Sequence, residues 1–285
     1  MHRIAILTHK LDHFEEMTHL LHGVSKIWRE QGMEVIILRG IDKRVEADVA
    51  ILHVDMTVVP DEYLRFLRQY PVTLNLAVKD ISKSAISRNV VKRGDGYDGP
   101  VIIKTNRNYG GGREAEMAQE GSFLHKYIRA IRRRLPWSMR AEIDTWKYPI
   151  FNSVREVPSV VWHNPDLMVD RFQPEKRDGF YCLRIWCFLG DAEESNLLYA
   201  NQPIIKSAVA VKTEPAPVPD ELREIRRQMG FDFGKFDYGI VDGRVVLYDA
   251  NRTPAVRDME QSVPAFKLLA RGIEPYLRSP LKIAG

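Results

Sequence analysis

The chain has 285 residues, of which 45% are hydrophobic and 28% charged, and it contains two cysteines. This composition excludes a disordered, collagenous or disulfide-stapled protein. Its 42 Lys and Arg residues against 38 Asp and Glu residues give a net charge of +4 with neutral histidines, far from the concentrated basic charge of a dedicated nucleic-acid binder. We therefore expect no nucleic-acid partner, while affinity for a phosphorylated small molecule stays open.

No targeting or membrane segment is expected. The first apolar run, residues 4–7, is too short for a signal peptide, and no run approaches the ~18 apolar residues of a membrane helix. Cys182 and Cys187 lie five residues apart in one predicted strand, so they point to opposite faces and cannot pair there. These features predict a protein of the reducing cytoplasm.

Residues 1–78 alternate between strand and helix patterns. Apolar residues recur at helical spacing between Phe14 and Trp28, and Pro60 and Asp61 open a second helix. Asp12 followed by Glu15 predicts a capping box for the first helix. The expected strands are residues 4–7, 34–38, 47–52 and 72–74. Such alternation predicts a parallel sheet covered by helices.

The middle of the chain is richer in glycine and charge. The patterns predict a helix over residues 79–91, a glycine-rich break at 94–100, a strand over 101–104, a polar loop over 105–112 and a helix over 113–134. Residues 137–164 show no clean period.

The last third reads as strands around one helix. Strands are expected at residues 167–169, 181–189 and 197–200, a helix at 220–229, and a hairpin with strands 237–241 and 245–249 around an Asp-Gly turn.

Lys104 ends a predicted buried strand and is followed by the run Gly110-Gly111-Gly112. An ammonium group beside unshielded backbone N–H groups suits phosphate oxygens. An ordinary flexible loop is the alternative, although a lysine in a buried strand needs a partner for its charge.

Asp237, Asp249 and Asn251 lie on the two strands of the predicted hairpin, with Asp237 near the level of Asp249. Three oxygen ligands without Cys or His suit Mg²⁺ or Mn²⁺ together with nucleotide phosphates. A solvated hairpin with acidic ends is the alternative.

Together these patterns resemble the ATP-grasp superfamily, in the type represented by glutathione synthetase, D-alanine–D-alanine ligase and ribosomal-protein glutamate ligase. The resemblance covers most of the chain and is carried by Lys79-Asp80-Ile81-Ser82-Lys83, Gly99-Pro100-Val101-Ile102-Ile103-Lys104, Leu183-Arg184-Ile185-Trp186 and Tyr248-Asp249-Ala250-Asn251-Arg252-Thr253-Pro254. It implies an α/β ATP-grasp fold with a parallel-sheet pre-ATP-grasp domain at 1–78, a small lid subdomain with the glycine-rich loop at 79–166, and a C-terminal subdomain with the adenine linker and metal site at 167–285.

The resemblance also implies a nucleotide-binding set. Lys83 and Lys104 would contact the phosphates of ATP, the loop 108–112 would close over them, residues 169–172 would form the adenine-binding linker and Asp178 would reach the ribose. The set is Lys83, Lys104, Tyr109, Gly110, Gly111, Gly112, Val169, Asp170, Arg171, Phe172 and Asp178.

For the reacting end, the resemblance implies that Asp237, Asp249 and Asn251 hold Mg²⁺. Its implied catalytic residues are Arg184 or Lys206 toward the transferred phosphate or substrate, Lys235 where several ligases carry an arginine, and Arg252 as a bidentate partner of a substrate carboxylate.

The implied activity is that of an ATP-dependent ligase that joins a small-molecule carboxylate to an amine through an acyl phosphate, forming a carbon–nitrogen bond. A homodimer stays open. The alternatives are a kinase or phosphotransferase on the same fold, and a nucleotide-binding regulatory module without turnover.

Three other features have mainly structural interpretations. His9, His13, His19 and His22 favour a solvated or substrate-facing helix edge over a metal site, because no third ligand is suggested by the spacing. The basic run 125–140 favours an exposed helix face over a nucleic-acid contact. Trp146, Trp162 and Trp186 are expected in packing.

Overall fold

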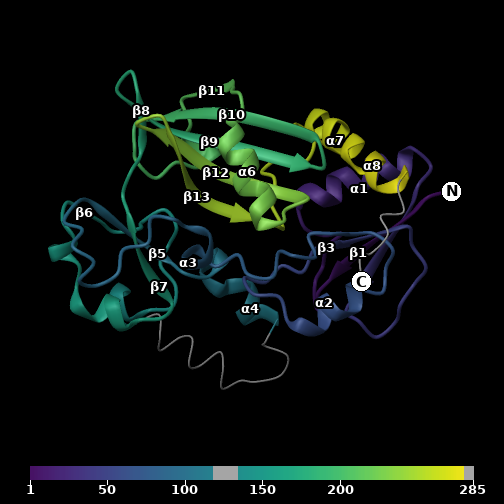
Figure 1. The fold of residues 1–285 in the computed structure, drawn as a ribbon, viewed down its shortest axis with the longest axis horizontal. Coiled ribbons are helices and arrows are strands. Elements are labelled where there is room, and N and C mark those ends of the chain that lie inside the picture. Colours follow the sequence, from purple (N-terminus) through teal and green to yellow (C-terminus); the bar gives the residue numbers. More distant parts are fainter. Residues whose placement is uncertain (118–133, 279–285) are drawn as a thin grey trace.

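Three β-sheets organise the chain in the computed structural model, which describes residues 1–117 and 134–278 (Figure 1). The first is parallel, in the order β2 (Glu34–Arg39), β1 (Arg3–Thr8), β3 (Val49–Leu52) and β4 (Thr73–Leu74). The second is antiparallel, in the order β6 (Ile150–Phe151), β5 (Val101–Thr105) and β7 (Leu167–Arg171). The third, here called the large sheet, has the order β11 (Lys212–Pro215), β10 (Ala192–Ala200), β9 (Phe180–Leu189), β12 (Phe233–Val241) and β13 (Arg244–Asn251), with β8 (Glu175–Arg177) also paired to β9. The predicted α/β class with an N-terminal parallel sheet is confirmed.

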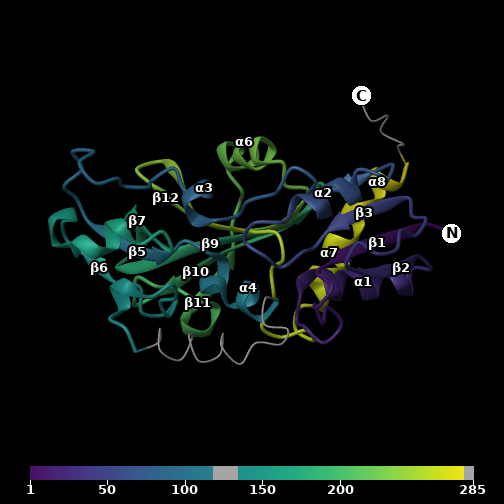
Figure 2. The same cartoon turned by 90° about the horizontal axis from the view of Figure 1, so that it is seen from below.

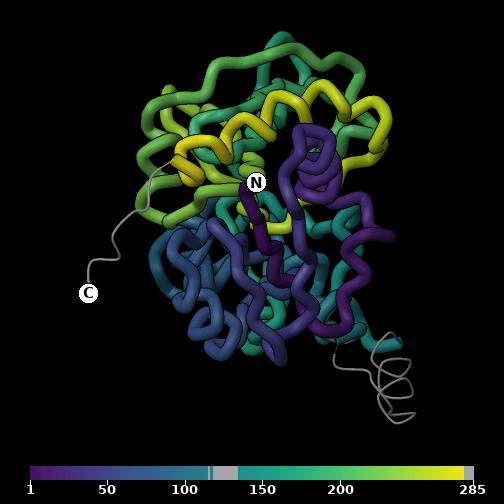
Figure 3. Tube along the Cα trace, turned by 90° about the vertical axis from the view of Figure 1, so that its right-hand side faces the viewer, coloured from purple at the N-terminus to yellow at the C-terminus, as the bar shows by residue number. Residues whose placement is uncertain are grey.

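The parallel sheet is buried on both faces. Residues 4–7 of β1 are fully buried, as the central strand of such a sheet requires. Ile4 and Ile6 point to one face, where they pack with α1 (Leu20–Glu30) and α7 (Val263–Ala270), while Ala5 and Leu7 pack on the other face with α2 (Asp61–Leu67). Figure 3 shows the yellow C-terminal helices beside the purple α1.

The C-terminal end of the chain therefore completes the N-terminal core. The indole Nε1 of Trp28 in α1 donates a hydrogen bond of 2.9 Å to the carbonyl of Ala270, and Phe266 and Ile273 belong to the same apolar cluster as Ile4. Helix α7 is followed by a 3-10 turn, η6 (Arg271–Ile273), and by α8 (Glu274–Arg278).

One face of the large sheet is covered by α6 (Asp220–Met229), which has the predicted bounds (Figure 2). Leu222 and Ile225 of this helix pack against Trp186 and Phe236. The buried position of Trp186 confirms its expected packing role. The opposite face of the sheet is left for the site described below.

The predicted helix over residues 79–91 is wrong. Only α3 (Lys83–Ile86) is helical, and Val90 forms an isolated bridge with Asp170. Polar side chains bind the backbone instead: Asp80 accepts a hydrogen bond from the Ser82 N–H, and the Ser87 hydroxyl accepts one from the Asn89 N–H. Such local bonds compete with a helix.

The predicted capping box is also wrong. Helix α1 begins at Leu20, with His19 at its N-cap and no side-chain cap. The carboxylate of Asp12 is buried instead against Arg113, at 3.2 Å. Of the predicted helix 113–134, α4 (Gly112–Met117) is helical, and residues 118–133, with most of the basic run, lie outside the described part of the chain.

The stretch without a clean period contains only short elements. They are η2 (Trp137–Met139), β6, η3 (Val154–Glu156) and η4 (Ser159–His163). Two further 3-10 turns lie elsewhere in the chain, η1 (Asn108–Gly111) and η5 (Ser207–Val209).

No helix in residues 1–117 and 134–278 is long and apolar enough to cross a membrane.

Two buried histidines lie where β3 ends. The rings of His53 and His19 meet edge to face with centroids 4.8 Å apart, and no ring nitrogen of either has a hydrogen-bond partner among the described residues. Burial lowers the pKa of His53 well below its usual value and lowers that of His19 as well. Both shifts favour the neutral form of the rings, most strongly for His53.

This pair predicts acid sensitivity. In the unfolded chain a histidine takes up a proton near pH ~6.5, whereas buried His53 does not, so stability is full above that pH and falls below it. We expect His53→Phe to reduce this fall by up to ~1.4 kcal/mol per pH unit. The measurement is urea unfolding between neutral and mildly acidic pH, with exposed His13→Gln as control. An unchanged slope in His53→Phe would contradict the assignment.

Candidate nucleotide and metal site

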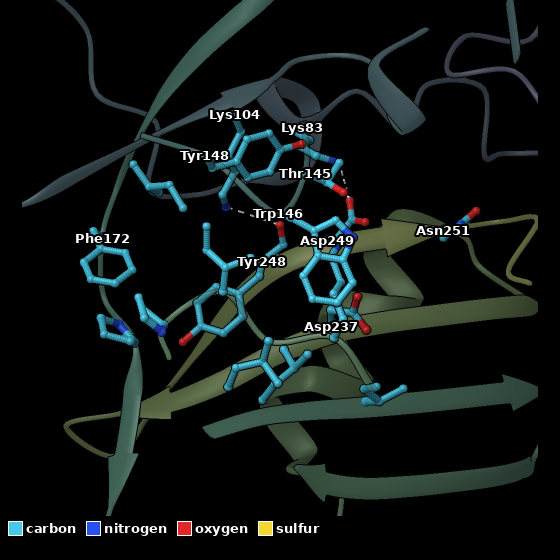
Figure 4. Close-up of a pocket in the computed structure, with 18 of the residues that line it drawn as sticks. Lys83, Lys104, Thr145, Trp146, Tyr148, Phe172, Asp237, Tyr248, Asp249 and Asn251 are labelled. Carbon is cyan, nitrogen blue, oxygen red and sulfur yellow. Dashed lines mark hydrogen bonds and ion pairs between the residues drawn. The ribbon is translucent and has the colours of Figure 1, made fainter. Parts of the chain in front are cut away.

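A cavity of about 450 Å³ lies between the three-stranded sheet and the uncovered face of the large sheet (Figure 4). Its size lies in the range of small-molecule sites. Residues on β5, β7, β9, β12 and β13 line it together with the segments 145–148 and 203–207. One part of the lining is apolar and aromatic, and another is charged.

The charged part begins with the β12–β13 hairpin. Asp237 pairs directly with Asp249 in the ladder, and Lys235 pairs with Asn251, so the predicted juxtaposition of the two carboxylates is confirmed. A bulge shifts the register between Asp237 and Tyr238 and leaves Tyr248 as the extra residue. Because a bulge interrupts the alternation of a strand, Tyr248 and Asp249 both face the cavity although they are consecutive.

Each carboxylate is paired with a lysine. The Nζ of Lys83 lies 2.9 Å from Oδ1 of Asp249, and the Nζ of Lys235 lies 3.0 Å from Oδ2 of Asp237. Burial acts to lower the pKa of Lys83, but Asp249 more than offsets it, so the pKa of Lys83 is raised. Burial conversely acts to raise the pKa of Asp249, and Lys83 brings it below its usual value.

Lys104 and Lys206 complete the basic lining. Lys104 forms a buried ion pair of 2.8 Å with Asp170, the partner that its position in a buried strand requires. The ammonium of Lys206 also lines the cavity. Burial lowers the pKa of Lys206, and the negative charges of Asp237 and Asp249 offset this only in part. A cation here is available to an anion.

The apolar part combines both sheets. Ile102 and Phe172 come from the three-stranded sheet and its continuation, and Leu183, Ile185 and Tyr248 come from the large sheet. This is a surface on which a planar heterocycle can lie between apolar walls. Arg171 also lines the cavity.

The glycine-rich loop forms η1 and contains three consecutive residues with positive φ, Tyr109 (49°), Gly110 (65°) and Gly111 (76°). Glycine allows this tight path at little steric cost. Only Asn108 and Tyr109 of the loop line the cavity, and Tyr109 is 67% exposed.

The loop and the helix after it are held against the parallel-sheet domain. The Asn108 N–H donates to the hydroxyl of Thr57 at 2.9 Å, and the Thr57 N–H donates to Glu114 at 2.7 Å. Arg113 of α4 lies 2.8 Å from Asp55.

Most predicted site residues meet at this cavity. Those that line it are Lys83, Lys104, Tyr109, Arg171, Phe172, Lys206, Lys235, Asp237, Asp249 and Asn251. Asp170 acts through Lys104, and Val169 is buried in the core of the three-stranded sheet. Gly110, Gly111 and Gly112 shape the loop without lining the cavity.

Arg184 does not reach the cavity, which corrects the expectation of a catalytic role. It lies on the face of β9 opposite Leu183 and Ile185, and its guanidinium forms two hydrogen bonds to buried Glu175, at 2.8 and 3.0 Å. Asp178 is an exposed residue in the turn between β8 and β9, with φ of 49°, also away from the cavity.

Arg252 also requires a correction. It is fully buried, and its guanidinium donates to the carbonyls of Val54, Met56, Val78 and Lys79. Burial lowers the pKa of Arg252 to about 10. Its guanidinium N–H groups are already bonded to backbone oxygens of the N-terminal segment. Arg252 therefore links that segment to the end of β13 and does not present its N–H groups to a substrate carboxylate.

Several lining residues escaped sequence reasoning. Tyr148 and Trp146 come from the stretch without a clean period, and Trp146 is 44% exposed at the cavity rather than packed in a core. The phenol of Tyr148 shares a 2.9 Å hydrogen bond with Thr105, next to Lys104. Gln173 and Tyr248 flank motif residues, so only their nearness to those motifs could have indicated them.

The hairpin residues fit a divalent cation. Asp237 Oδ1 is buried and has no hydrogen-bond partner among the described residues, and an orphaned carboxylate oxygen suits a hard cation. No group of three or more His, Cys, Asp or Glu side chains suited to a metal occurs in the described residues. The Asn251 amide oxygen accepts hydrogen bonds from the Thr253 N–H and hydroxyl at 2.8 and 3.3 Å, so a cation here would depend mainly on the two carboxylates, phosphate oxygens and water.

No protein-family profile matches the sequence, and no curated protein matches it. Solved structures do. The D-alanine–D-alanine ligase from Bacillus anthracis aligns over 98% of this chain and 99% of its own, with 12% identity and a TM-score of 0.51. A RimK-domain ATP-grasp protein from Sphaerobacter thermophilus aligns over 97% and 100%, also with 12% identity and a TM-score of 0.51. The chain therefore has the ATP-grasp fold, as its motifs suggested.

Proposed function

We propose that this protein is an ATP-dependent carboxylate–amine ligase whose cavity binds ATP with Mg²⁺ or Mn²⁺. The observation that carries the proposal is the pairing of Asp237 with Asp249, ringed by four lysines, beside an apolar slot. A triphosphate needs such cations, and a purine needs such a slot. The similarity in fold to a D-alanine–D-alanine ligase supports this class.

Each group of residues has a task in this proposal. Phe172, Ile185 and Tyr248 would hold the base, while Lys83, Lys104 and Lys206 would bind phosphate oxygens and Tyr109 would cover them. Asp237, Asp249 and Asn251 would hold the cation, which when bound neutralises phosphate charge and orients the terminal phosphoryl group. The expected division into segments 1–78, 79–166 and 167–285 needs two changes, because α7 packs in the core of the N-terminal sheet and β7 pairs with β5.

The reaction proceeds in two displacements. An oxygen of the substrate carboxylate attacks the terminal phosphorus of ATP, ADP leaves, and an acyl phosphate forms. The nitrogen of an amine then attacks the acyl carbon, loses a proton, and phosphate leaves. Charge neutralisation by positioned lysines is the main contribution of this chain to the first step.

Two unpaired cysteines, Cys182 and Cys187, fit a reducing compartment.

Hydroxylamine trapping tests the proposal. The protein is incubated with ATP, Mg²⁺, hydroxylamine and a panel of small carboxylates, since an acyl phosphate reacts with hydroxylamine to give a hydroxamate. We expect a hydroxamate and an equal amount of ADP with at least one carboxylate. A phosphate ester formed from a hydroxyl panel would indicate a kinase instead. Thermal stabilisation by ATP without ADP release from either panel would indicate a regulatory module.

A further inference from the structure

Four side chains share one face of the β12–β13 hairpin and form two neighbouring cross-strand pairs. Asp237 lies opposite Asp249, and Lys235 lies opposite Asn251. All four line the cavity. Asp237 and Asp249 thus offer carboxylate oxygens, Asn251 carries an amide oxygen that already accepts hydrogen bonds from Thr253, and Lys235 carries an ammonium group.

The ammonium of Lys235 is fixed next to Asp237 by the strand itself. Residues two apart on a strand point to the same face, and here the Lys235 Nζ lies 3.0 Å from Asp237 Oδ2. Lys83 differs from Lys235, because it lies on α3, a separate element, and contacts Asp249 from outside the hairpin. It could therefore turn toward a bound phosphate without a change in the hairpin.

The lining of the cavity carries more positive than negative side chains. Among the described lining residues, Lys83, Lys104, Arg171, Lys206 and Lys235 are basic, and only Asp237 and Asp249 are acidic. One divalent cation accompanying a nucleoside triphosphate leaves an anionic complex for these basic groups. Asp237 has one oxygen free for a cation, Oδ1, because Oδ2 is paired with Lys235. A second divalent cation at this carboxylate would have to displace the ammonium group or meet its repulsion at short range.

We infer that the hairpin of this protein holds one divalent cation with its nucleotide, and that the ammonium of Lys235 occupies the place beside Asp237 that a second cation would take. The inference rests on the proposed nucleotide site. It assigns Lys235 a positioning role toward Asp237, distinct from direct contact with the substrate.

Metal counting tests this role without measuring turnover. The protein is dialysed to equilibrium against Mn²⁺ and a non-hydrolysable ATP analogue, and the excess of metal on the protein side is divided by the excess of nucleotide. We expect one Mn²⁺ per nucleotide for the natural protein. Lys235→Met removes the charge and keeps the chain length, and it should raise the ratio to two. Lys267→Met makes the same change at an exposed lysine of α7 outside the cavity and should leave the ratio at one.

The other outcomes are distinguishable. A ratio of two in the natural protein would overturn the inference while leaving the proposed function intact. A ratio of one in both Lys235→Met and Lys235→Gln would also overturn it, as would loss of nucleotide binding in both variants, since a counter-ion replaceable by metal is dispensable for that binding. Failure of the natural protein to bind the analogue would overturn the proposed function and the inference together.

Discussion

Asp249→Asn should remove metal-dependent turnover while leaving the protein folded. The substitution keeps the shape of the side chain but removes the ion-pair partner of Lys83 and, in the proposed site, one anionic ligand of the cation. Because the proposed mechanism relies on charge stabilisation at the phosphoryl group, we expect a loss of at least ~10²-fold in kcat. The loss in kcat is measured as the rate of ADP release with the carboxylate that the hydroxylamine assay identifies.

A matched control lies on the same hairpin. Asp242, exposed in the β12–β13 turn with φ of 51°, can be changed to Asn without strain, because Asn tolerates this conformation. Asp242→Asn should retain full turnover. Full activity in both variants would show that the acidic hairpin is structural and that the nucleotide lies elsewhere.

Arg252→Ala should cost stability rather than substrate affinity. It removes a buried guanidinium and the hydrogen bonds that it donates to the carbonyls of Met56 and Val78. Each buried acceptor left without a donor costs about 1–3 kcal/mol. We expect a marked drop in the denaturant midpoint, measured by urea unfolding.

Arg257, exposed in the loop that follows, supplies the comparison. Arg257→Ala should shift the midpoint little, since exposed substitutions usually change stability by less than ~0.5 kcal/mol. An Arg252→Ala protein of normal stability with a raised KM for the carboxylate would restore the substrate-binding role that its sequence position suggested.

The hairpin was predictable because its signals are local. An Asp-Gly turn fixes the register of the two strands to within a residue, so the sequence places Asp237 near the level of Asp249, and the bulge beside Tyr238 makes the two residues direct partners. The parallel sheet followed from alternating strand and helix patterns in the same way. The overall fold was accessible because its motifs occur in a recognisable order.

The roles of the two arginines were not predictable in this way. To predict the role of Arg184, one must know which face of β9 lies toward the cavity. Its neighbour Leu183 lines the cavity, so Arg184 points to the other face and pairs with Glu175. To predict the role of Arg252, one must know which backbone carbonyls surround the end of β13. These carbonyls belong to residues 54–79, which are remote in sequence. Tyr248 faces the cavity because of a bulge, which breaks the alternation on which strand reasoning depends.

The packing of α7 on α1 also bears on how the chain folds during synthesis. A ribosome releases the N-terminal sheet before Phe266, Leu269 and Ile273, which close one side of its core and follow all three sheets in the sequence. Until then Ile4, Val24 and Trp28 lack part of their apolar cover. Nascent chains that expose such surface are prone to association. The N-terminal sheet is therefore completed only after the strands of the large sheet have been synthesised.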